Sequence, residues 1–329
     1  MKKRITLWLL AILFLANVSL ADAQQTGKIP RIGFLDGSTA SGMAGLLEAF
    51  RQELSKLGWI EGKNIAIEYR FGEQKSERLP ELAADLVRLQ VDLIVVTAGA
   101  PVLAAKGATT TIPIVMTNAT DPVRAGLVAS LARPGGNVTG LSGLADELNT
   151  KRLEILKDAV PKLVRVGLLR QPLASIALDL QLSELRTAAL ALKLKLEEIE
   201  TQYDPKSLES AFKTAKQKQV GAIMTMTTRA FFVERKRIVE LAAKYRLPAI
   251  YFQKEFVDEG GLMSYGADFE DLYRRVAVYV DKILKGAKPA DLPVQQATKF
   301  EFVINLKAAK QIGLTLSPEF LSRANQVIK

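Results

Sequence analysis

The stretch VGAIMTMTTRAFFVERKRIVELAAKYRLPAIYF, residues 220–252, decides the fold expected for this chain. Its first part, 220–226, is an apolar run of the kind that forms a strand buried on both faces. Residues 229–245 then carry apolar side chains at helical spacing, and 248–252 form a second apolar run. A helix between two such strands is typical of a βαβ unit, whose strands lie parallel. The stretch therefore predicts an α/β protein with a mostly parallel sheet.

The same alternation extends over the rest of the chain from residue 31 onward. Strands are predicted at 31–35, 65–69, 93–96, 112–116, 164–169, 194–199 and 300–304, and helices at 42–57, 79–89, 175–192, 206–218, 268–285 and 306–312. In each half, a strand that begins near a proline, Pro113 or Pro248, is followed by an irregular stretch ending in Gly-Gly. We therefore predict two similar α/β lobes, each with a doubly wound parallel sheet.

The first residues, MKKRITLWLLAILFLANVSLADA, have the order of a secretory signal peptide. A positive start precedes an apolar centre and the small-residue cleavage site Ala21-Asp22-Ala23. We predict that residues 1–23 are removed and that the chain works in the periplasm, without stable insertion in a membrane. An uncleaved anchor is the alternative, because the charge-free run 5–21 approaches the roughly 20 residues that cross a bilayer. The chain has no Cys, so it is not expected to be a lipoprotein.

The residue types that are missing exclude most catalytic chemistry. The chain contains no Cys and no His, so Ser-His-Asp and Cys-His catalysis and His-ligated metals are impossible. It also lacks the glycine-rich phosphate-binding motifs and the GxSxG motif. We therefore predict no catalytic residue, metal or cofactor, although a hydrolase that uses only carboxylates stays open. The formal net charge of +10 is spread along helical segments, which indicates solvated surfaces and not nucleic-acid binding.

Polar side chains follow many of the predicted strands. Open α/β sheets bind ligands beyond the carboxyl ends of their strands, and this mixture of groups suits a small polar or zwitterionic ligand. Donors near Thr97 and Gly99 are predicted to bind a carboxylate, and Asp121 an ammonium group. Tyr251 or Tyr265 would cover an apolar side chain. The predicted ligand-binding residues are Ser38, Thr39, Thr97, Ala98, Gly99, Asn118, Thr120, Asp121, Thr227, Thr228, Tyr251, Tyr265 and Asp268.

Several of these residues have a purely structural alternative. Asp121 precedes a proline and is equally suited to a turn. The threonines at 97, 227 and 228 follow strands, where a hydroxyl commonly caps the next helix. Asp268 opens a predicted helix, which favours a cap over a ligand contact. Tyr251 belongs to an apolar strand and could be core.

Four long strings carry a resemblance to a known family. AFRQELSKLGWIEGKNIAIEYRF at 49–71 and IPIVMTNATDPVRAGLVASLARPGGNVTG at 112–140, with the segments 246–275 and 285–314, closely resemble the TrpX-like ABC transporter substrate-binding protein family. The resemblance implies a type I periplasmic binding protein, in which two α/β lobes are joined by a three-segment hinge and close on a ligand. Asp121 in its TDPV string and Tyr265 in its SYG string match the family's pattern.

The resemblance also implies boundaries and partners. One lobe would comprise 28–141 plus 266–299, and the other 142–265 plus 300–329. The chain would be a monomeric receptor that captures a small organic, amino-acid-like ligand, with aromatic amino acids as one class. It would deliver this ligand to an ABC permease and its ATPase. An exported carboxylate-dependent hydrolase and a ligand-presenting subunit of a membrane sensor are the alternatives.

Overall fold

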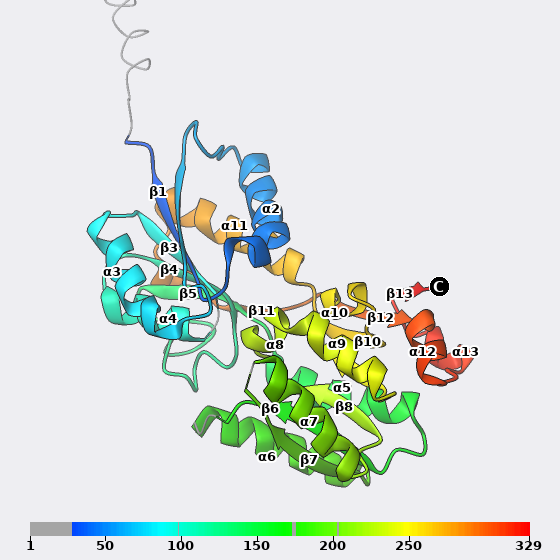
Figure 1. The fold of residues 1–329 in the computed structure, drawn as a ribbon. Helices are drawn as coiled ribbons and strands as arrows, with labels where there is room; N and C mark the ends of the chain where they lie inside the picture. Colours follow the sequence, from blue (N-terminus) through cyan, green and yellow to red (C-terminus); the bar gives the residue numbers. More distant parts are fainter. Residues whose placement is uncertain (1–27, 98, 173–175, 203) are drawn as a thin grey trace, which may run out of the picture.

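Two β-sheets organise the chain in the computed structural model, which describes residues 28–97, 99–172, 176–202 and 204–329 (Figure 1). The predicted signal peptide lies outside the described residues, as does the candidate residue Ala98. Within the described ranges, no helix combines the length and the apolar character that crossing a membrane requires.

The first sheet has the strand order β11-β5-β4-β3-β1-β2, and its strands pair in parallel. Alternate strand residues point to opposite faces, where α2 and α11 pack on one side and α3 and α4 on the other. The elements are β1 (Arg31–Asp36), α2 (Ala40–Lys56), β2 (Ala66–Phe71), α3 (Leu79–Arg88), β3 (Leu93–Val96), α4 (Ala100–Ala108), β4 (Ile114–Ala119), β5 (Val138–Ser142), α11 (Phe269–Leu284) and β11 (Gln295–Gln296).

The second sheet has the order β13-β12-β10-β9-β8-β6-β7 and is parallel except where β10 pairs with β12. One continuous apolar core surrounds it, in which α5 packs on α6 and α7 on α9. The elements are α5 (Ala145–Ala159), β6 (Arg165–Arg170), α6 (Ile176–Ala191), β7 (Lys195–Glu200), α7 (Pro205–Gln217), β8 (Ala222–Thr225), α8 (Arg229–Val233), α9 (Arg235–Lys244), β9 (Ala249–Tyr251), α10 (Glu255–Asp258), β10 (Met263–Ala267), β12 (Phe300–Asn305), α12 (Leu306–Ile312), α13 (Pro318–Leu321) and β13 (Gln326–Ile328).

The chain passes between the two lobes at three places (Figure 1). It leaves the first sheet after β5, returns after β10 to form α11, and leaves again between β11 and β12. The predicted fold class, two mostly parallel α/β lobes with a three-segment hinge, is thereby confirmed. The exact residue boundaries given for each lobe stay a prediction.

Two helices differ from the sequence prediction. The predicted helix 229–245 is two helices, α8 and α9, which meet at Glu234. The short helix α8 carries the adjacent aromatic residues Phe231 and Phe232, and both are buried. Helix α5, for which no prediction was made, follows β5 directly.

Candidate functional site

The largest cavity described, about 510 Å³, lies at the carboxyl ends of strands from both sheets. This volume is within the range usual for small-molecule sites. The residues that follow β1, β3, β4, β6, β8 and β9 contribute to it, as expected for open α/β sheets. Its walls include several of the predicted binding residues: Thr97, Gly99, Asn118, Thr120, Thr227 and Thr228.

Three other predicted residues lie beside the cavity and bond within the protein. Ser38 donates to Asp36 through both its amide and its hydroxyl group. Thr39 caps helix α2 by accepting from the Gly42 amide at 3.2 Å. Asp121 accepts from the Arg124 amide at 3.0 Å and its side chain at 2.7 Å, on an exposed turn. None of the three is among the residues that line the cavity.

The remaining predicted residues also have structural partners. Tyr251 is buried and stacks on Phe256, with ring centroids 4.6 Å apart. Tyr265 stacks on Phe300 near the crossing into α11. Asp268 caps α11 by accepting from the Asp271 amide at 2.9 Å. The roles predicted for these side chains in ligand binding stay predictions.

The carboxylate that lines the cavity is Asp36, at the end of β1. It is fully buried, and its Oδ1 accepts from the Ser38 amide at 2.6 Å and hydroxyl at 2.5 Å. Its Oδ2 has no hydrogen-bond partner among the described residues. An ionised oxygen buried without a partner is costly, so this atom is well suited to accept from a ligand cation. In the sequence, the feature that points to Asp36 is its position directly after the first predicted strand, 31–35.

Aromatic side chains from both lobes form the apolar part of the cavity. Phe232 and Phe252 come from the second lobe, while Phe269 and Tyr273 come from α11 on the first. Gln253 lies beside them, nearly fully buried, and its Nε2 has no hydrogen-bond partner among the described residues. The site thus combines one carboxylate, several hydroxyl and amide groups, and a ring-lined space for an apolar group.

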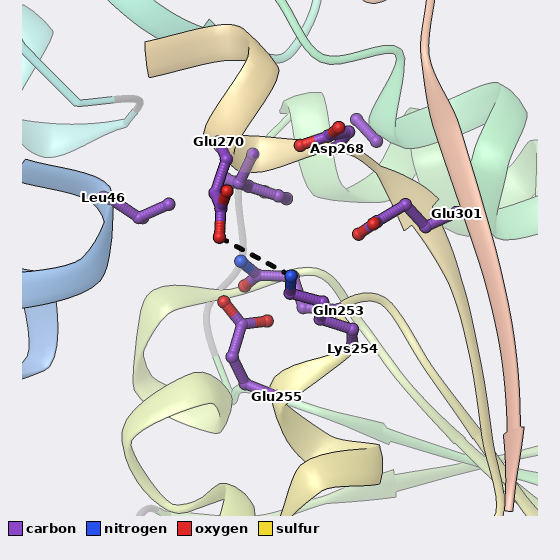
Figure 2. Close-up of a pocket in the computed structure, with 9 residues that line it drawn as sticks. Leu46, Gln253, Lys254, Glu255, Asp268, Glu270 and Glu301 are labelled. Atoms are coloured by element: carbon purple, nitrogen blue, oxygen red, sulfur yellow. Dashed lines mark ion pairs between the residues drawn. The ribbon is translucent and has the colours of Figure 1, made fainter. Parts of the chain in front are cut away.

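A second cavity of about 10 Å³ lies where charged side chains from the two lobes meet (Figure 2). The Lys254 ammonium, next to α10, lies 3.6 Å from a carboxylate oxygen of Glu270 on α11. Glu255, Asp268 and Glu301 surround this ion pair. The space holds about one water molecule, so we interpret it as a contact between lobes and not as a ligand site. No group of acidic side chains in the described ranges is arranged to hold a metal ion.

This charged contact is expected to make stability depend on pH. Burial raises the pKa of both Glu255 and Glu301. The folded protein therefore keeps these protons to a higher pH than the unfolded chain does. The stability that they contribute is complete below the ordinary carboxyl pKa of about 4.3 and is lost as the pH rises through the raised pKa.

The double variant Glu255→Gln/Glu301→Gln tests this dependence because both positions stay neutral at every pH. Its melting temperature is expected to exceed that of the wild type by a margin that grows to a few degrees from about pH 4 to about pH 7. Melting curves of both proteins across this range measure the margin. A margin that does not change with pH would contradict the assignment.

Comparison with known proteins decides the family. The ABC transporter substrate binding protein family matches residues 38–328, which is most of the chain. The chain belongs to this family. The match includes β10, β12 and the crossings between the lobes, so it covers both walls of the cavity. As a substrate binding protein of this family, the chain is assigned to a class that binds ligands.

Three relatives of this substrate binding protein extend the comparison. A tyrosine-binding protein of Clostridioides difficile is 30% identical over 271 residues, which cover 81% of this chain and 76% of the relative. A conserved domain protein from Vibrio cholerae is 28% identical, with a TM-score of 0.83 over 91% of this chain and 100% of that one. An ABC domain from Streptococcus pneumoniae, solved in complex with L-Trp, is 26% identical, with a TM-score of 0.81 over 92% and 100%.

Proposed function

We propose that this chain is the receptor of an ABC importer and captures a single aromatic amino acid between its lobes. One observation carries the proposal: a buried carboxylate oxygen of Asp36 without a partner lines a cavity that four aromatic rings also line. The carboxylate would bind the ligand's ammonium group, and the rings would cover its side chain. Relatives described as tyrosine-binding and as bound to L-Trp support this ligand class.

We further propose that the chain delivers its ligand to a permease and its separate ATPase, which the family's description as ABC transporter substrate binding proteins supports. The chain would act in the periplasm as a monomer after removal of residues 1–23. Among the described residues that line the cavity, Asp36 is the one carboxylate, whereas a carboxylate-only hydrolase needs a pair. This favours binding and release of the ligand over its chemical conversion.

A thermal-shift screen of the purified protein against the common amino acids and small organic acids tests the proposal. A ligand present at 100 times its dissociation constant stabilises the folded protein by about 2.7 kcal/mol. For a protein of this size the melting temperature is then expected to rise by about 4 °C with L-tyrosine or L-tryptophan.

Mass spectrometry of the same mixtures supplies the control. The ligand is expected to be recovered unchanged, and neutral amino acids without a ring are expected to give smaller shifts. Stabilisation by no amino acid would contradict the proposed ligand class. A product that accumulates with time would contradict the proposed role as a receptor.

A further inference from the structure

The most deeply buried cation among the described residues is Arg152, on helix α5. Its side chain is 1% exposed and donates hydrogen bonds to three segments of the second lobe. Nη1 donates to the Tyr265 carbonyl at 3.0 Å, and Nη2 donates to Asn149 Oδ1 at 2.5 Å and to Thr227 Oγ1 at 2.8 Å. The guanidinium thus holds α5, strand β10 and the loop after β8 together.

The positive charge of Arg152 is not compensated by a described carboxylate. None of the ion pairs among the described side chains includes it, and its Nε has no hydrogen-bond partner there. Burial lowers the pKa of the guanidinium to about 9, which still leaves it charged at neutral pH. A buried cation is costly unless an anion offsets it. The second lobe therefore carries a positive charge directly behind the wall of the cavity that Thr227 forms.

The bond from Arg152 also fixes what the Thr227 hydroxyl can do. A guanidinium has only donors, so Thr227 Oγ1 must accept from it. The hydroxyl hydrogen of Thr227 is then directed elsewhere, and no described group accepts it. Thr227 is half-buried and lines the large cavity. Its free hydrogen is therefore available to an acceptor in that cavity.

We infer that Arg152 is a positioning residue that makes Thr227 a hydrogen-bond donor to the carboxylate of the bound ligand. This inference rests on the proposed function and adds the orientation of the ligand. The ligand's carboxylate lies against Thr227 on the second lobe, and its ammonium group lies against Asp36 on the first. A zwitterion would then bind both lobes through its two charges, and a ligand that lacks either charge would hold only one lobe.

Isothermal titration with L-tyrosine and L-tyrosinamide tests this orientation. The two probes share the ring and, at mildly acidic pH, the ammonium group, but the amide lacks the carboxylate charge. The wild type is expected to prefer the acid by on the order of 100-fold, from one charge-assisted hydrogen bond and the nearby cation. In Thr227→Val and Arg152→Met this preference is expected to fall to about tenfold or less.

Two conservative variants and one control separate positioning from folding. Thr227→Ser keeps the hydroxyl and is expected to keep the preference for the acid. Arg152→Lys keeps the charge but cannot donate all three hydrogen bonds, so it is expected to lose part of this preference. Thr225→Val is the matched control: Thr225 lies two residues earlier, is buried at the end of β8, and has a hydroxyl without a partner among the described residues that does not line the cavity. It is expected to keep the wild-type preference.

The possible failures are distinguishable. If the wild type binds neither L-tyrosine nor L-tryptophan, the proposed function is wrong and this inference with it. If the wild type binds acid and amide equally, or if Thr227→Val weakens both by the same factor, the proposed function stands and the orientation is wrong. The Thr227 variants keep the test decisive should Arg152→Met not fold.

Discussion

Replacing Asp36 with asparagine is expected to weaken the binding of L-tyrosine and L-tryptophan by about 100-fold. The substitution keeps Oδ1 as the acceptor for Ser38, so the loop after β1 retains its geometry. It replaces the unpartnered Oδ2 with an amide nitrogen, which carries no negative charge and repels an ammonium group. Titration calorimetry on the wild type and on Asp36→Asn measures the loss directly.

The ligand-free stability of the same variant gives a second readout. Because a buried charge without a partner disfavours folding, the melting temperature of Asp36→Asn without ligand is expected to equal or exceed that of the wild type. A protein that is more stable alone and binds more weakly has lost a binding group and not its fold. A variant that is much less stable would instead show that Asp36 serves the fold.

Asp121→Asn is the matched control, because the sequence predicted Asp121 as the partner of the ammonium group. In the structure this carboxylate is bonded to Arg124 on an exposed turn and does not line the cavity. Its substitution is expected to change affinity by less than about threefold, as is usual for an exposed ion pair. Full affinity in Asp36→Asn together with a large loss in Asp121→Asn would favour the sequence-based assignment of Asp121 and contradict the role proposed for Asp36.

The two aspartates illustrate what the sequence could predict about the site. Asp36 ends β1 and Asp121 follows β4, so strand order alone places them at the same edge of the sheet. Which of the two faces the cavity depends on local turns: the backbone of Asp121 is left-handed, with φ of 33°, and turns back toward Arg124. Such a turn is compatible with the residue types but is not specified by them.

The burial of Arg152 could not be predicted from the sequence, for a related reason. Helix α5 follows Leu144 without a side-chain cap, so the usual start signal of a helix is missing. An arginine in an amphipathic segment is ordinarily expected to face solvent. In the fold, β10 and the loop after β8, both far along the chain, bring Tyr265 and Thr227 into hydrogen-bond contact with it.

The strands were more predictable, because apolar runs report burial directly. The run at β3 is buried throughout, as expected for a strand covered on both faces. Strand β12 was also predicted, but its partner was not, and it pairs antiparallel with β10. The spacing of apolar residues and the composition of a segment determine whether it forms a strand. Which strand it pairs with depends on how distant segments are brought together in the fold.

Gly266→Ala is expected to destabilise the protein by about 3 kcal/mol, because it places a methyl group inside an existing backbone contact. A Cβ at this position would lie 2.0 Å from the carbonyl oxygen of Phe252, and backbone atoms cannot rotate away as a flexible side chain does. Strand β10 would have to separate from the end of β9 just before the chain crosses to α11. The melting temperature is expected to fall by about 5 °C.

The separation of β10 from β9 is also expected to weaken ligand binding, because Phe252 lines the cavity and moves with the end of β9. Affinity for L-tyrosine should therefore fall together with stability. In Asp36→Asn, by contrast, affinity is expected to fall while stability is kept or raised. Gly107→Ala is the control: this glycine is exposed in α4, and a Cβ there meets nothing within 4 Å. Alanine favours a helix over glycine by about 0.5–1 kcal/mol, so Gly107→Ala should melt slightly higher. Equal melting temperatures for the two variants would show that β9 and β10 do not approach this closely at the hinge.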